Sequence, residues 1–113
     1  STDEETNNRR NAIRNATLTA SEVPFETVTL GMELLNCQEA LAQRGNGNAV
    51  SDVGVAALLT SAAIKGALFN VEINLQSLPE EMGEEMRQKI PEMRKLCSEV
   101  SRKIMHAVHG RMA

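Results

Sequence analysis

The segment from Gly45 to Gly54, which reads G-N-G-N-A-V-S-D-V-G, combines residue types that could carry chemistry. It places amide, hydroxyl and carboxylate side chains where a long apolar run begins. A helix that starts here would offer free backbone N–H groups to an anion or a polar heterocycle. If apolar surroundings withdrew Asp52 from water, its carboxyl group would be suited to proton transfer. A structural alternative stays open, and the residue types alone favour it: Ser51 caps the helix, Asp52 interacts with the helix dipole, and the glycines form a turn.

Three other groups of polar residues have structural explanations that the sequence favours. Asn70 and Asn74 are four residues apart, and we expect them to hydrogen-bond to a neighbouring helix rather than to a substrate. His106 and His109 are too few ligands for a metal site, so no metal is expected. The basic residues of the last segment could attract an anionic substrate tail, but a solvated helix face is favoured. These residues are Arg87, Lys89, Arg94, Lys95, Arg102 and Lys103.

Helices must position these residues, because apolar side chains recur at intervals of three and four and no strand pattern competes. We expect helices near 9–21 and 23–44, with a break or kink at Pro24, and a third at 51–75. A last helix is expected to open at Pro79 and to be kinked or divided at Pro91. Residues 1–8 are expected to be disordered. Short loops between long helices predict an all-α antiparallel helical bundle with 1–113 in one domain.

The segment 51–75 is apolar on nearly every face, which is typical of a central core helix or of a membrane span. Lys65 and several polar residues within it favour a buried central helix and no membrane. We expect the preceding segment to bury most of an apolar face made of Val28, Leu30, Leu34, Leu35, Cys37 and Leu41. In the last helix, a stripe is expected to fill the core or an interface: Met82, Met86, Ile90, Met93, Cys97, Val100, Ile104 and Val108.

Composition narrows the class of protein. The net charge is -3, with an acidic middle and a basic end: residues 20–86 hold ten acids and two bases, and residues 87–113 hold two acids and seven bases. Phe25 and Phe69 are the only aromatic residues. A negative charge and so few rings argue against nucleic-acid binding. Two lone cysteines and a polar first segment without a secretory pattern indicate a reducing compartment, so we expect a cytoplasmic protein.

Two motifs, in order and correctly separated, identify a resemblance. Residues 45–59 read G-N-G-N-A-V-S-D-V-G-V-A-A-L-L, and residues 66–75 read G-A-L-F-N-V-E-I-N-L. Earlier in the chain, residues 20–25 read A-S-E-V-P-F. This pattern closely resembles the formiminotetrahydrofolate cyclodeaminase and methenyltetrahydrofolate cyclohydrolase family. The resemblance is strong over residues 11–76, and residues 77–113 are compatible with it.

The resemblance implies a helical domain that usually dimerises and converts 5-formiminotetrahydrofolate to 5,10-methenyltetrahydrofolate with release of ammonia. The tetrahydrofolate derivative is the substrate, and no further cofactor is expected. By this resemblance Asp52 would exchange the protons, Asn48 and Ser51 would orient the substrate or Asp52, and Gly54 would allow close approach of the pterin. Glu22 would bind the donor edge of the pterin or have a structural role, and both alternatives stay open.

Two other functions stay open. The same family includes enzymes that interconvert methenyl- and formyl-tetrahydrofolate, and a non-catalytic helical interaction module would have the same composition. Family members also carry an earlier P-G-G-G-S-type segment that these residues lack. We therefore expect this chain to be the C-terminal portion of a domain. A homodimer and the N-terminal part of that domain are the expected partners. A shortened bundle would expose the apolar segment 51–75, so something else must cover it.

Overall fold

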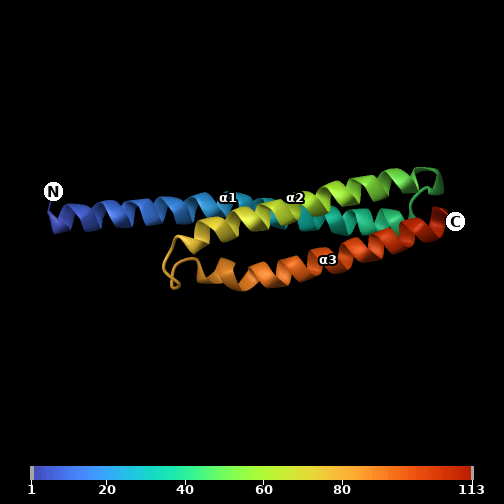
Figure 1. The fold of residues 1–113 in the computed structure, drawn as a ribbon. Coiled ribbons are helices and arrows are strands. Elements are labelled where there is room, and N and C mark those ends of the chain that lie inside the picture. Colours follow the sequence, from blue (N-terminus) through green and yellow to red (C-terminus); the bar gives the residue numbers. More distant parts are fainter. Residues whose placement is uncertain (1, 113) are drawn as a thin grey trace.

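Helix α1, Asp3–Arg44, is the longest element of the computed structural model, which describes residues 2–112 (Figure 1). Thr2 caps it: its side chain accepts a hydrogen bond from the Glu5 backbone, and the Glu5 carboxylate accepts one from the Thr2 backbone. This reciprocal capping box stabilises the first turn. The expectation that residues 1–8 are disordered is therefore wrong for residues 3–8, which are helical. Residue 1 lies outside the described residues.

Pro24 does not break α1, so the expected division into two helices near this residue is wrong. A proline inside a helix removes one backbone hydrogen bond and costs about 3 kcal/mol. On the same helix, Ser21 and Val28 flank Pro24 and are both fully buried. Packing of the buried face against the rest of the bundle holds the helix together across the proline, which sequence alone cannot show.

Helix α2, Val50–Gln76, follows a short 3-10 turn, η1, at Gly47–Ala49, and helix α3, Glu84–Met112, completes the chain. The extent of α2 confirms the prediction of a helix at 51–75. Helix α3 starts five residues later than expected, because residues 80–83 form a turn that ends at Gly83 with φ of 68°. Pro91 lies inside α3 and does not divide it.

The three helices run antiparallel in sequence order, and each packs against the other two (Figure 1). This confirms the predicted all-α bundle. The molecule is elongated, 69 × 19 × 15 Å, and the first part of α1 projects beyond the turn between α2 and α3. Helix α2 contributes more buried residues than either neighbour. The largest fully buried side chains form the core: Val28, Leu35, Ile64, Leu68, Val71, Leu75, Cys97 and Ile104.

One side of the bundle stays open. The predicted apolar face of α1 is only partly buried, since Val28 and Leu35 are covered whereas Leu30, Leu34 and Leu41 are about half exposed. Two shallow grooves, of about 600 and 380 Å³, follow the junction of α1 and α2 and have no α3 residue in their lining. We call the apolar residues on this side the open face: Val23, Leu30, Leu34, Leu59, Ala63 and Ile73.

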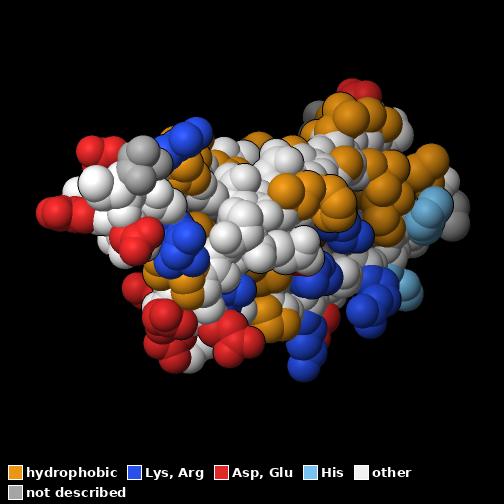
Figure 2. Space-filling view, turned by 60° about the vertical axis from the view of Figure 1, so that its left-hand side comes forward, with side chains coloured by type: hydrophobic (Ala, Val, Ile, Leu, Met, Phe, Trp, Pro, Cys, Tyr) orange, Lys and Arg blue, Asp and Glu red, His pale blue; other side chains and the backbone are white. Residues whose placement is uncertain are grey.

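Hydrophobic side chains also gather over the upper right of the surface in Figure 2, and Lys and Arg side chains adjoin this area below. By length and composition alone the segment Gly47–Gln76 could cross a membrane, with a mean hydropathy of 1.5 over its most apolar window. Its buried side packs against α1 and α3, as the core helix of a bundle does.

Candidate functional site

The candidate site is the corner of the bundle where α1 ends and α2 begins. Gly45 is needed there, because a Cβ atom on it would lie 2.5 Å from the Leu41 carbonyl oxygen. The turn that follows is held by Asn46, whose side chain accepts a hydrogen bond from the Asn48 backbone at 2.9 Å and whose carbonyl accepts one from Ala49 at 3.0 Å. The G-N-G-N sequence thus builds a tight connection that fixes the start of α2.

Asn48, Ser51 and Asp52 all lie exposed at this corner. The structural alternative for Ser51 is wrong, because α2 begins one residue earlier, at Val50, and its N-cap Ala49 offers no side-chain hydrogen bond. Within residues 2–112, no hydrogen bond or ion pair occupies any of these three side chains. They surround the positive end of the α2 dipole, where an anionic or polar group is stabilised.

Asp52 does not meet one expectation: α2 does not withdraw it from water, since its side chain is exposed in the first turn. The reason is that α3 covers the first turns of α2 only on the side of Gly54, so Asp52 stays in contact with solvent. The grooves along the open face are not lined by Asn48, Ser51 or Asp52. Within this chain the corner is a set of polar side chains without an enclosing wall.

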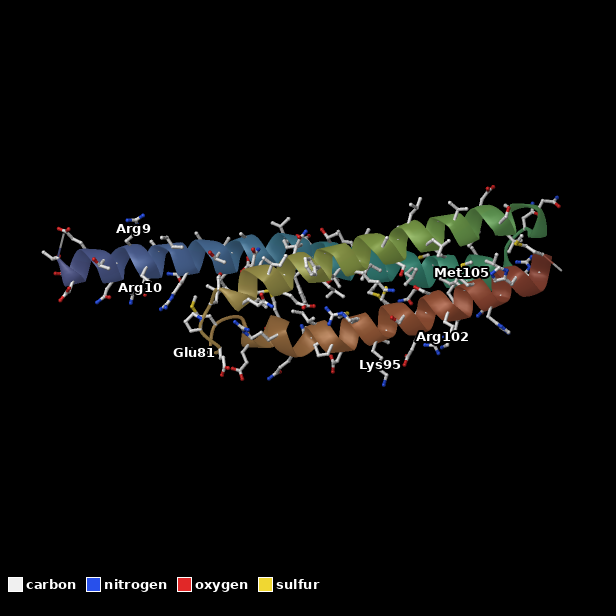
Figure 3. The ribbon with its side chains drawn as sticks, viewed as in Figure 1. Arg9, Arg10, Glu81, Lys95, Arg102 and Met105 are labelled. Atoms are coloured by element: carbon white, nitrogen blue, oxygen red, sulfur yellow. The ribbon has the colours of Figure 1, made fainter. Side chains whose placement is uncertain are left out.

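Gly54 lies on the side of α2 that faces the inside of the bundle, away from the corner. It is buried, and a Cβ atom on it would lie 3.2 Å from Cγ1 of Val108 on α3. Met105 lies beside it, on the inner side of α3, whereas Lys95 and Arg102 point outward (Figure 3). The structure therefore gives Gly54 a packing role between α2 and α3, where the sequence predicted close approach of a pterin.

Glu22 lies far from Asp52. Because α1 and α2 are antiparallel, with Gln38 bonded to Thr60 and Val23 sharing a groove with Ile73, Glu22 is level with the end of α2. That level is about 21 residues from Asp52, or roughly 30 Å along the helix. The single chain thus does not bring Glu22 into the corner.

Glu22 instead lines a separate groove of about 570 Å³ between α1 and the start of α3. Phe25 lies in this groove, and the Lys89 ammonium is 5.9 Å from its ring centre. Ser21, next to Glu22, is fully buried and donates a hydrogen bond to the Thr17 carbonyl. The A-S-E-V-P-F motif therefore places the Ser21 side chain in the core and the Glu22 side chain on the surface.

The remaining polar candidates lie at the surface. The expected helix-to-helix hydrogen bonds of Asn70 and Asn74 are not formed among the described residues, because both line the open groove between α1 and α2. His106 and His109 are exposed. Of the basic residues, Arg94 pairs with Glu72 and Lys89 with Glu85, while Arg87 turns inward to bind backbone carbonyls.

Sequence reasoning missed Arg111. This residue comes from the end of α3 and donates hydrogen bonds to the carbonyls that close α1, at Ala42 (2.9 Å) and Gly45 (2.5 Å). The only signal in the sequence is a cation near a helix C-terminus. That position does not reveal that its partner is another helix, 66 to 69 residues away along the chain.

Comparison with known proteins gives a consistent result. Residues 1–104 match the family model described as formiminotransferase-cyclodeaminase. The chain is 36% identical over 88 residues to a methenyltetrahydrofolate cyclohydrolase of Methylorubrum extorquens, covering 78% of this chain and 42% of that protein. It is 38% identical over 81 residues to a formimidoyltransferase-cyclodeaminase of Gallus gallus, and this match covers 72% of this chain and 15% of that protein. The matched region is thus less than half the length of either relative.

Proposed function

Because the chain belongs to the formiminotransferase-cyclodeaminase family, we propose that it is part of a 5-formiminotetrahydrofolate cyclodeaminase. The observation that carries this proposal is the corner of α2. There Asn48, Ser51 and Asp52 are exposed together, and no contact within the described chain accounts for them. Asp52 lies in the first turn of α2, where its charge suits the helix dipole, but none of the three side chains makes a hydrogen bond or ion pair within the described chain. Because they also lie in the segment on which the resemblance rests, they are the natural candidates for contact with a substrate.

The chemistry requires a group that moves protons. N10 of the folate attacks the formimino carbon on N5, and N10 loses its proton as the new bond forms. The formimino C=N bond becomes a C–NH2 group that takes the proton lost by N10. A second proton, from water, then lets this nitrogen leave as ammonia as its C–N bond breaks, which gives the methenyl cation. A carboxylate placed between the two nitrogens would take the first proton and return one to the leaving group.

We assign that role to Asp52. Asn48 and Ser51 would hold the substrate or the Asp52 carboxylate by hydrogen bonds. No cofactor is proposed besides the tetrahydrofolate substrate itself. Glu22 is proposed only as a contact in its own groove, because roughly 30 Å of helix separates it from Asp52.

Methenyltetrahydrofolate cyclohydrolase activity is the second candidate, and the name of the Methylorubrum relative favours it. In that reaction water attacks the methenyl carbon, and the same carboxylate would accept a proton from the water. One of the two C–N bonds of the bridge then breaks, and its nitrogen takes a proton, which leaves a formyl group on the other nitrogen. The two activities differ in their products, since only the cyclodeaminase releases ammonia.

The test uses two proteins, the 113-residue chain and a longer chain that adds an N-terminal part with the glycine-rich segment. Formation of methenyltetrahydrofolate from 5-formiminotetrahydrofolate is followed by its near-ultraviolet absorbance, and ammonia is measured in parallel. Asp52→Asn should lower kcat by about 100-fold or more, which is typical of a lost general acid–base group. The control is Glu92→Gln, which removes an exposed carboxylate on α3 far from the corner.

Full activity in Asp52→Asn, with unchanged helicity, would contradict the role of Asp52. Hydrolysis of methenyltetrahydrofolate without ammonia release from the formimino substrate would replace the cyclodeaminase by the cyclohydrolase. If neither protein binds folate, the non-catalytic interaction module becomes the better explanation.

We also propose that the open face is covered in the working protein. Its exposed apolar side chains, and the 42% of the Methylorubrum relative that the match covers, support a homodimer or a covering N-terminal part of the domain. We propose that this protein acts in the cytoplasm, where both cysteines would stay reduced.

A further inference from the structure

The end of α1 lacks the usual way of closing a helix. Many helices end on a left-handed residue whose backbone N–H groups satisfy the last carbonyls. Here Gly45 is extended, with φ of -77° and ψ of -177°, and its N–H reaches only the Leu41 carbonyl. The remaining carbonyls of the last turn need another donor.

Arg111 supplies that donor from α3. Its Nη1 atom donates to the Ala42 carbonyl at 2.9 Å, with the Leu41 carbonyl at 3.5 Å, and its Nη2 atom donates to the Gly45 carbonyl at 2.5 Å. A guanidinium group suits this task, because its donors form a rigid planar fork and its charge complements the negative end of a helix.

The last two turns of α3, which carry Val108 and Arg111, also contact the start of α2. Val108, one turn before Arg111, is 2% exposed and packs where Gly54 leaves room for it. Arg111 also approaches Gly47 in the turn, with Nη2 3.5 Å from the position of a Cβ atom there. The end of α3 therefore contacts α1, the connecting turn and α2, so it holds both sides of the corner.

We propose that Arg111 is a positioning residue that fixes the turn Gly45–Ala49 and, through it, the placement of Asn48, Ser51 and Asp52. Arg111 lies beyond residue 104, where the family match ends, so the match does not account for it. The expected effect of Arg111 on turnover rests on the proposed function. Its expected effect on the order of the turn is independent of that function.

The first experiment measures amide hydrogen exchange in the wild type, Arg111→Met, Arg111→Lys and the control Arg102→Met. Arg102 is an exposed arginine on the same helix that points away from the other two (Figure 3). We expect Arg111→Met to speed exchange over residues 45–53 by roughly tenfold or more, as the loss of a charge-assisted hydrogen bond implies. Residues 64–71 of the core should be unaffected, and Arg111→Lys should recover part of the protection, because a lysine cannot bridge three carbonyls.

Unchanged exchange over residues 45–53 in Arg111→Met, or an equal rise across all three helices, would overturn the proposal. The second experiment measures turnover in the longer, active protein. Arg111→Met should lower kcat about tenfold or more with a small change in KM, Arg111→Lys should restore part of it, and Arg102→Met should match the wild type. Faster exchange over the turn with unchanged kcat would overturn the claim that Arg111 positions Asn48, Ser51 and Asp52 for turnover. A wild type without turnover would contradict the proposed function and leave the exchange result as the test of Arg111.

Discussion

At the residue scale, Gly83 shows how one position permits the turn between α2 and α3. It is the only residue of the described chain with a positive φ, at 68°. A Cβ atom on it would lie 2.6 Å from Cδ2 of Leu75 and 3.2 Å from Cδ1 of Leu18. We predict that Gly83→Ala lowers the free energy of unfolding by about 1–3 kcal/mol, through left-handed strain and overpacking. Urea denaturation followed by far-ultraviolet circular dichroism measures it.

The matched control for Gly83 is Gly66, which lies in the middle of α2, where a Cβ atom would have no neighbouring atom within 4 Å. Alanine has the higher helix propensity, so Gly66→Ala should raise stability by up to about 1 kcal/mol. If both substitutions shifted the unfolding midpoint in the same direction, the turn geometry would not be the cause.

At the element scale, α2 ends in the same way as α1, with its carbonyls bound by an arginine from α3. The Arg87 guanidinium donates to the carbonyls of Leu75, Leu78 and Met82 at 2.5, 3.2 and 3.1 Å. Ser77 caps the end of α2 locally, through its backbone N–H and its hydroxyl group on the Asn74 carbonyl, and Arg87 adds a donor from α3 to Leu75 and to the turn that follows. We predict that Arg87→Met costs about 2–4 kcal/mol of unfolding free energy, because part-buried carbonyls lose a charged donor.

Urea unfolding of Arg87→Met is compared with that of Arg102→Met, which removes an exposed arginine of α3 for which no hydrogen bond is found among residues 2–112. The control should stay within about 0.5 kcal/mol of the wild type, as exposed substitutions usually do. Equal midpoints for the two variants would show that water satisfies the end of α2 as well as Arg87 does.

At the scale of the whole molecule, the open face governs association. Leu59 is 68% exposed on α2, beside the grooves between α1 and α2. Burying one leucine contributes roughly 1.5–3 kcal/mol. If a homodimer covers this face, Leu59→Glu should therefore weaken self-association by about tenfold or more, measured by sedimentation at several protein concentrations.

Leu96→Glu on α3 is the control, because Leu96 is also an exposed leucine, at 45%, and lies on neither groove of the open face. Equal effects of the two variants would argue against a specific dimer on this face. If the 113-residue chain is a monomer and the longer chain protects Leu59 from solvent, the N-terminal part of the domain covers the face instead.

Much of the fold could be predicted from the sequence. Apolar spacing of three and four residues predicted an all-helical chain with a long helix at 51–75, and the Gly-Asn cluster predicted where the connection before that helix falls. The wrong predictions were the disorder of residues 3–8, the break at Pro24 and the helix start at Pro79. Local rules predicted a break at Pro24 and a helix start at Pro79, whereas the flanking buried residues carry α1 through its proline and the Gly83 turn delays α3.

For the candidate site too, the sequence predicted the local arrangement, and tertiary packing decided the rest. The motif Asn48 to Asp52 is local, so its residues lie together as the sequence predicts. Gly54 and Glu22 depend on which face of a helix meets a neighbour and on how far along the bundle each lies. Only the packing of α3 turned Gly54 inward, and only the antiparallel register placed Glu22 far from Asp52. Arg111 is the extreme case, because contacts between residues nearly seventy positions apart leave no local pattern in the sequence.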